Sequence, residues 1–79
     1  MRIEIVTPDT ILFDGDNVHL VQLPGIDGSF EVMDHHAPLI SLLKKGSVKV
    51  MIKGNDPKFF EINGGVIEVL QNKVLILAE

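Results

Sequence analysis

The chain of 79 residues contains no cysteine, tryptophan or tyrosine, and its only aromatic residues are four phenylalanines. Without cysteine it forms no disulfide and offers neither a thiol nucleophile nor a cysteine-containing metal site. The apolar residues, 46% of the chain, are mostly Ile, Leu and Val, which favour strands. We expect one domain over residues 1–79 with a small core. This apolar content exceeds what such a core can bury, which predicts a partner surface.

Long hydrophobic runs and an excess of basic residues are missing too. The longest apolar runs, such as Val74–Ala78, are far shorter than the roughly 20 residues that span a bilayer. Seven Lys and Arg oppose eleven Asp and Glu, a formal net charge of −4. That sign is wrong for neutralising the phosphates of a nucleic acid. We therefore expect neither direct bilayer insertion nor binding to nucleic acid.

Turn-forming residues recur at short intervals, with short β-branched segments between them. The turns fall at residues 7–9, 14–17, 24–28, 46, 54–57, 64–65 and 71–73. This spacing is typical of an all-β sandwich or barrel, and it delimits about eight candidate strands. Alternation of apolar and polar residues over Arg2–Val6 and Val48–Lys53 predicts that each forms a half-buried strand.

Two segments are apolar on both faces, Val66–Leu70 and Val74–Ala78. Such a segment either lies centrally between layers or holds one face against another protein. We expect the second case, with Val66, Val69 and Leu75 as test positions on the outward face.

The segment Pro38–Gly46 carries conflicting signals. Proline near its start, two lysines near its end and a glycine after them are typical of a short helix. Nine residues make a marginal helix in water, and the leucines could equally face two layers of a β protein. The balance favours a strand.

Candidate catalytic and metal-binding residues are few. His35 and His36 are adjacent, so in an extended segment they point to opposite faces and do not readily ligate one ion together. His19 or Asp34 would have to join one of them, and the alternative is that these are surface or interface histidines. No serine lies in a nucleophile-elbow context. We expect no metal, no cofactor and no catalysis by this chain.

Lys73 raises a second functional class. It lies in or beside the predicted turn Gln71–Lys73, and small all-β carrier domains present a lysine on a hairpin turn for attachment of lipoate or biotin. The Asp-Lys-Ala or Met-Lys-Met context of those domains is absent. An ordinary solvated lysine, with Asn72 in a left-handed conformation, is the simpler interpretation.

The order of these motifs resembles the N-terminal domain of the epsilon subunit of F-type ATP synthases. The resemblance covers essentially the whole chain and rests on "LPG" at 23–25, "HAPL" at 36–39 and "GGVIEV" at 64–69, with the family's spacing. It implies a flattened β-sandwich of about ten short, mainly antiparallel strands, including one at Pro38–Lys45. It also implies a non-catalytic rotor subunit that binds the gamma subunit and the c-ring, coupling ion translocation to ATP synthesis.

The resemblance also implies a place and contact residues for the subunit. The family lies on the cytoplasmic face of the bacterial inner membrane, held peripherally by the ATP synthase complex. Positions matching Thr7, His36 and Ser41 lie toward gamma. The loop matching Ile26–Glu31, namely Ile26, Asp27, Gly28, Ser29, Phe30 and Glu31, faces the c-ring.

Three departures from the family pattern bear on these expectations. Glu31 stands where the family usually has Gly, and Asp34-His35 replaces a common Pro-Gly, which alters the shape and charge expected of the loop near the c-ring. The family usually continues into two helices that inhibit hydrolysis and, in some members, bind ATP. This chain stops at Glu79, so those roles are expected to be absent from it.

Overall fold

Seven strands make up the regular structure of the computed structural model, which describes residues 1–79. The strands are β1 (Arg2–Val6), β2 (Ile11–Gly15), β3 (Val18–Gly25), β4 (Gly28–Met33), β5 (Leu39–Ile52), β6 (Lys58–Leu70) and β7 (Lys73–Ala78). They form one sheet in the order β2-β1-β7-β6-β5-β3-β4. Neighbouring strands are antiparallel except β1 and β7, which run parallel.

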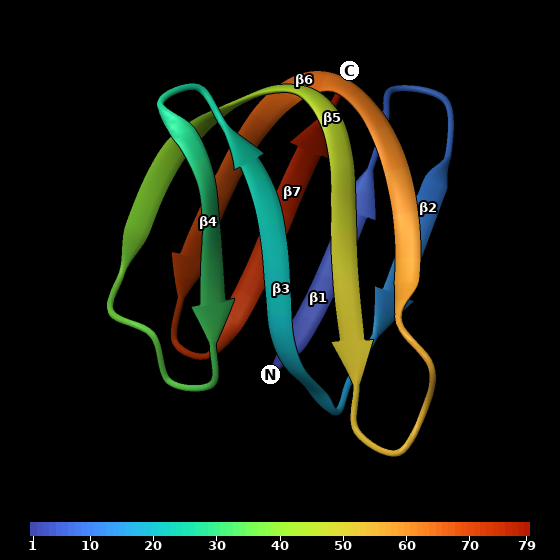
Figure 1. Cartoon of the computed structure of the whole chain (residues 1–79), viewed down its shortest axis with the longest axis vertical. Helices are drawn as coiled ribbons and strands as arrows, with labels where there is room; N and C mark the ends of the chain where they lie inside the picture. The colour runs from blue at the N-terminus through green and yellow to red at the C-terminus, as the bar shows by residue number, and fades with distance from the viewer.

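The sheet folds over on itself, so that one sheet supplies both layers of a sandwich. Figure 1 shows β5 and β6 curving over the top of the molecule, with β3 and β4 in the front layer and β1 and β7 behind. The predicted β-sandwich is confirmed, but the expected number of about ten short strands is wrong. The difference arises because β5, with 14 residues, and β6, with 13, each run unbroken through both layers.

The ambiguous segment Pro38–Gly46 forms the first half of β5 from Leu39 onward, so the strand prediction is confirmed. Its register with β6 is constant, from Leu39 opposite Val69 to Val50 opposite Lys58. This long ladder satisfies the backbone donors and acceptors, whereas a helix of nine residues would leave most of its terminal groups unpaired. Tertiary pairing therefore overrides the local helix signals.

The corner at which β5 and β6 pass between layers is built from glycines. Gly64 and Gly65 have φ angles of 132° and 149°, which side chains rarely adopt. A Cβ atom on Gly65 would overlap the carbonyl oxygen of Leu77, and one on Gly46 would lie 2.8 Å from Cβ of Pro24. The glycines allow close approach of backbones where the sheet bends.

The core lies between the two layers and contains sixteen buried apolar residues. Ile3 and Ile5 of β1, and Val48 and Val50 of β5, are fully buried, which confirms the half-buried strands that alternation predicts. Phe13 of β2 packs against Phe60 of β6 with ring centroids 5.5 Å apart. The sandwich thus offers two stiff outer faces and two open strand edges, β2 and β4.

Candidate functional site

A hollow forms where the tip of the β3–β4 hairpin approaches the beginning of β5. It has a volume of about 370 Å³ and is lined by Gly25, Ile26, Asp27, Gly28, Phe30, Ile40, Ser41 and Leu42. The backbone N–H of Ile26 donates to the carbonyl oxygen of Leu42 at 3.2 Å, which ties the hairpin to β5. We call this the hairpin hollow.

Two glycines give the hairpin hollow its shape. Gly28 has a φ of 132°, as the expected tight turn at Asp27-Gly28 requires. A Cβ atom on Gly25 would lie 2.8 Å from the ring of Phe30, so glycine there lets the ring sit against the hairpin backbone. The ring therefore forms part of the wall of the hollow.

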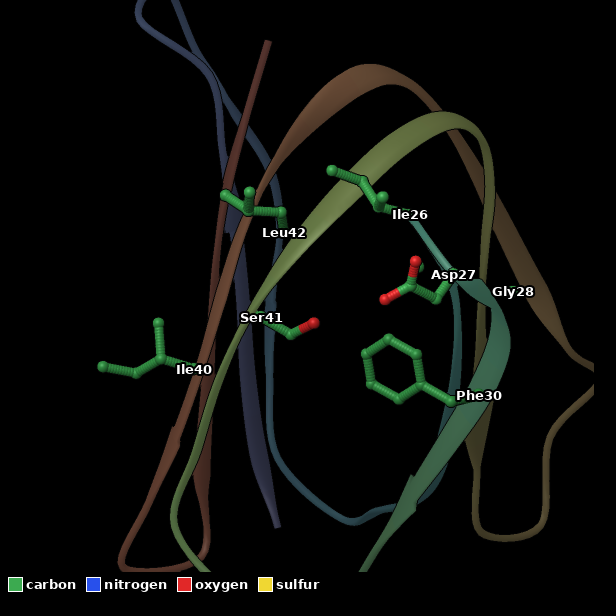
Figure 2. A pocket seen from close by; sticks show the side chains of 8 residues that line it. Ile26, Asp27, Gly28, Phe30, Ile40, Ser41 and Leu42 are labelled. Atoms are coloured by element: carbon green, nitrogen blue, oxygen red, sulfur yellow. The ribbon is translucent and has the colours of Figure 1, made fainter.

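Two polar groups reach into the hollow near that ring. Figure 2 shows the carboxylate of Asp27, from the turn between β3 and β4, and the hydroxyl of Ser41, from β5, directed into the hollow, with the Phe30 ring below Asp27 and Ile40 pointing away. A carboxylate, a hydroxyl and an aromatic face suit contact with a protein side chain. The structure thereby brings Ser41, expected to face gamma, beside residues expected to face the c-ring.

The remaining residues of the expected c-ring loop lie elsewhere on β4. Ser29 and Glu31 are exposed and alternate with Phe30, so they occupy the opposite face of the strand. Glu31 pairs across the sheet with Gln22 of β3. The six residues Ile26–Glu31 therefore present two surfaces, the hairpin hollow and an outer side of the front layer.

Thr7 and His36 lie apart from Ser41 and from each other. The turn after β1 and the loop between β4 and β5 are at opposite ends of the molecule (Figure 1). The hydroxyl of Thr7 accepts the backbone N–H of Asp9 at 3.3 Å and of Thr10 at 3.1 Å, which holds its own turn. His36 is exposed, with Nδ1 2.7 Å from the carbonyl oxygen of Ala37.

The turn at residues 33–36 shows how Asp34-His35 can replace the Pro-Gly that is common in the family. The N–H of His36 donates to the carbonyl oxygen of Met33 at 3.3 Å, and His35 has a φ of 61°. A β-turn with a left-handed third residue is what Pro-Gly also forms, so Asp34-His35 preserves the backbone shape. This turn lies at the other end of the molecule from the hairpin hollow, which corrects the expectation that it reshapes the loop near the c-ring (Figure 1).

Asp34 anchors this turn to the first residue of the chain. The ammonium group of Met1 donates to Oδ1 of Asp34 at 2.7 Å and to the carbonyl oxygen of Val18 at 2.9 Å. The hydrogen bond from this ammonium group, aided by its charge and by nearby His35 and His19, holds the pKa of Asp34 below its usual value, with burial opposing it. The ionised carboxylate therefore favours the folded state.

This lowered pKa gives a pH-dependent prediction for Asp34→Asn. A depressed carboxyl pKa stabilises the fold above the unfolded value of about 3.9, and the stabilisation is lost as the pH falls through the folded pKa. We expect the variant to melt below the wild type from pH 5 to 7, with the difference closing below about pH 4. Calorimetric melting across this range tests it, and a difference that does not narrow as the pH falls below about 4 would contradict the ion-pair explanation.

An apolar surface covers the outside of the rear layer. The sequence motifs did not identify its residues as one surface. Leu42 of β5, Val66 of β6 and Leu77 of β7 stand opposite one another across the strands, and so do Ile40, Glu68 and Leu75. Ile40 is 72% exposed, Leu42 57% and Leu77 52%. We call these six residues the outer apolar face.

The signal for this surface in the sequence is the pair of segments that are apolar on both faces. The structure buries one side of each, for example Val69 at 2% exposure, and leaves Val66, Leu75 and Leu77 outside. Val69 is therefore wrong as an outward test position, because its side chain belongs to the core. Val66 and Leu75 are placed as expected.

Lys73 follows the turn that connects β6 and β7. Gln71 and Asn72 form the β6–β7 turn with positive φ angles, as predicted for Asn72. Lys73 is the first residue of β7, and its Nζ lies 3.1 Å from a carboxylate oxygen of Glu4.

No three His, Cys, Asp or Glu side chains come together where they could hold a metal ion. The structure also contains no helix with the length and apolarity needed to cross a membrane.

Comparison with known proteins identifies the family to which the sequence is similar. The family model described as ATP synthase, Delta/Epsilon chain, beta-sandwich domain matches residues 1–79. The chain is 41% identical over 78 residues to the ATP synthase epsilon chain of Chlorobium limicola, an alignment that covers 99% of this chain and 88% of that protein. It is 40% identical over 87 residues to the ATP synthase epsilon chain of Salinibacter ruber, where it spans 58% of the relative's length.

Solved structures share the fold. A chain of the Euglena gracilis mitochondrial ATP synthase, in a structure of OSCP, F1 and the c-ring, matches with a TM-score of 0.89 at 19% identity, covering 96% of this chain and 48% of that one. A chain from the central stalk and c-ring of the Tetrahymena thermophila mitochondrial ATP synthase matches with a TM-score of 0.82 at 17% identity. It covers 98% of this chain and 61% of the Tetrahymena chain.

Proposed function

The chain belongs to the delta/epsilon β-sandwich family of ATP synthase subunits, and from this premise we propose that it is a non-catalytic subunit of the central stalk. In this role it binds the gamma subunit and the c-ring and thereby couples ion translocation to ATP synthesis. The observation that carries the proposal is the outer apolar face, which lies beside the hairpin hollow on one stiff sheet. A rotor coupling needs fixed shape and apolar area rather than a titrating catalyst.

The hairpin hollow is the proposed contact with the c-ring. Ile26 is 53% exposed at the tip of the hairpin, and Asp27 offers a carboxylate directly beside it. The tip is held by the Ile26–Leu42 hydrogen bond, so it presents these groups on a short, braced turn. Such bracing suits a contact that must transmit torque.

The outer apolar face is the proposed contact with gamma. Ser41 and its neighbours Ile40 and Leu42 connect this face to the hairpin hollow, so the two proposed contacts adjoin along the start of β5. Thr7 and His36 are assigned to the gamma contact by family resemblance, at its two ends. The proposed site in the cell is the cytoplasmic face of the bacterial inner membrane, reached through the ATP synthase complex.

The carrier alternative has weaker support. Lys73 lies beside the turn rather than at its tip and pairs with Glu4, which a covalent modification would disrupt. Family membership covers the whole chain and favours the stalk subunit.

Binding to purified gamma and to the c-ring, measured by calorimetry and co-sedimentation, tests the proposal. We expect one-to-one binding to gamma that weakens about 30-fold or more for Leu77→Asp, because an apolar contact within the interface is replaced by a charge. Ile26→Asp is expected to weaken retention on the c-ring and to leave gamma binding unchanged.

Phe59→Asp is the matched control, since Phe59 is 62% exposed and lies on the outside of the front layer. It should bind gamma like the wild type. Folded wild-type protein that fails to bind gamma would reject the proposed function, and equal losses for Leu77→Asp and Phe59→Asp would reject the assigned face.

A further inference from the structure

Glu68 lies at the centre of the outer apolar face. On β6 it stands directly between Ile40 of β5 and Leu75 of β7, and side chains so paired have Cβ atoms about 5 Å apart. With Ile40, Val66, Leu75 and Leu77 it lines a shallow groove of about 240 Å³. Its carboxylate is exposed and forms no ion pair within the chain.

The two other acidic residues of the rear layer are neutralised by neighbours. Glu4 pairs with Lys73 at 3.1 Å and with Arg2 at 3.7 Å, and Asp14 pairs with Arg2. Arg2 and Lys73, near the beginning of β1 and β7, are thus engaged by Glu4 and Asp14. Lys73 also lines a hollow with Glu68 but forms its ion pair with Glu4, so Glu68 has no ion-pair partner within the chain.

The acidic residues on strands of the front layer have polar neighbours instead. Glu31 stands opposite Gln22, and Glu61 stands opposite Ser47. Neither interrupts an apolar surface. Glu68 therefore differs from every other carboxylate on a strand, because both of its cross-strand neighbours are apolar and it forms no ion pair.

This placement restricts what can cover the face. A partner that buries Ile40, Leu75 and Leu77 also removes water from the carboxylate between them, which costs several kcal/mol unless a cation pairs with it. A second copy of this chain docked face to face would bring two Glu68 carboxylates together near the symmetry axis. Like charges without water disfavour that dimer, and the formal net charge of −4 adds to the repulsion.

We propose that Glu68 is the specificity-determining residue of the gamma contact, receiving a lysine or arginine of gamma at the centre of an otherwise apolar interface. This inference rests on the proposed function and adds to it the residue that selects the partner and prevents self-association. An arginine would suit the site best, because its planar guanidinium binds a carboxylate through two parallel hydrogen bonds.

The first test compares Glu68→Gln with Glu61→Gln, a matched control on the same strand. Removal of one partner from a desolvated charge pair is expected to raise the Kd for gamma about 30-fold or more, whereas Glu61→Gln stays within about twofold of the wild type. In a scan of gamma, alanine substitution of one lysine or arginine should weaken wild-type binding but cause no further loss with Glu68→Gln.

The second test uses Glu68→Leu and measures molar mass by light scattering. This variant is expected to gain self-association at concentrations at which the wild type is monomeric, while its affinity for gamma falls because the cation of gamma then lacks a partner. The opposite signs of the two changes distinguish a selecting charge from general damage to the surface.

The outcomes separate this inference from the function on which it rests. If wild-type protein binds gamma and Glu68→Gln binds equally well, the role of Glu68 is overturned and the stalk function stands. If folded wild-type protein does not bind gamma, the proposed function itself fails. A wild-type dimer that Leu77→Asp dissociates would overturn the inference by showing that a second copy covers the face.

Discussion

Replacement of Gly65 by alanine is expected to lower the free energy of unfolding by about 3 kcal/mol. Gly65 has a φ of 149°, in which a Cβ atom costs about 1–2 kcal/mol. That atom would also overlap the carbonyl oxygen of Leu77, so β6 and β7 must move apart at the corner, at a further cost of about 1–3 kcal/mol. Urea unfolding followed by circular dichroism measures the change.

Gly28→Ala is the control for this prediction. Gly28 has a similar φ of 132°, but a Cβ atom there meets nothing within 4 Å. Its substitution should cost only the backbone term, about 1–2 kcal/mol. Equal losses for the two variants would show that crowding at the corner of the sheet contributes nothing.

The second large effect is expected for Val69→Asp, which should leave the chain unfolded at 25 °C. Val69 is 2% exposed among the core residues of β6, and an isolated carboxylate there costs several kcal/mol in addition to the lost apolar contacts. A domain of 79 residues has a total stability of about 4–12 kcal/mol, so one such change can consume it. Loss of the β-sheet circular dichroism signal is the readout.

Val66→Asp, three residues away on the same strand, is the matched comparison. Val66 lies on the outer apolar face, where an aspartate remains in contact with water. This variant should fold and bind gamma weakly. If Val66→Asp also unfolds, the distinction between the inner and outer faces of β6 is wrong.

Sequence patterns predicted the class of fold because strand alternation and turn residues are local signals. Ile3 and Ile5 share a buried face as their spacing of two requires, and Asn72 takes the left-handed conformation expected in its turn. The number of strands was less predictable. Gly46 and Gly64-Gly65 have the composition of turns, yet they lie within β5 and β6 and bend continuous strands between layers.

The candidate surfaces were predictable only in part. The family resemblance supplied Ile26–Glu31 and Ser41, but not the meeting of four residues of that segment with Ser41 in one hollow, because that depends on how the hairpin docks on β5. Glu68 belongs to the "GGVIEV" motif, but the motif alone gives it no special role, since a single glutamate on a strand is ordinary until its neighbours on adjacent strands are known.

The sequence by itself determined the excess of apolar residues, the absence of cysteine chemistry and the all-β class of the fold, because composition and a period of two are properties of the chain alone. Only the tertiary structure decided which apolar residues face outward and which carboxylate lacks a partner. In segments apolar on both sides, such as Val66–Leu70, alternation does not distinguish core from surface. The distinction comes from pairing with β5 and β7, which are distant parts of the chain.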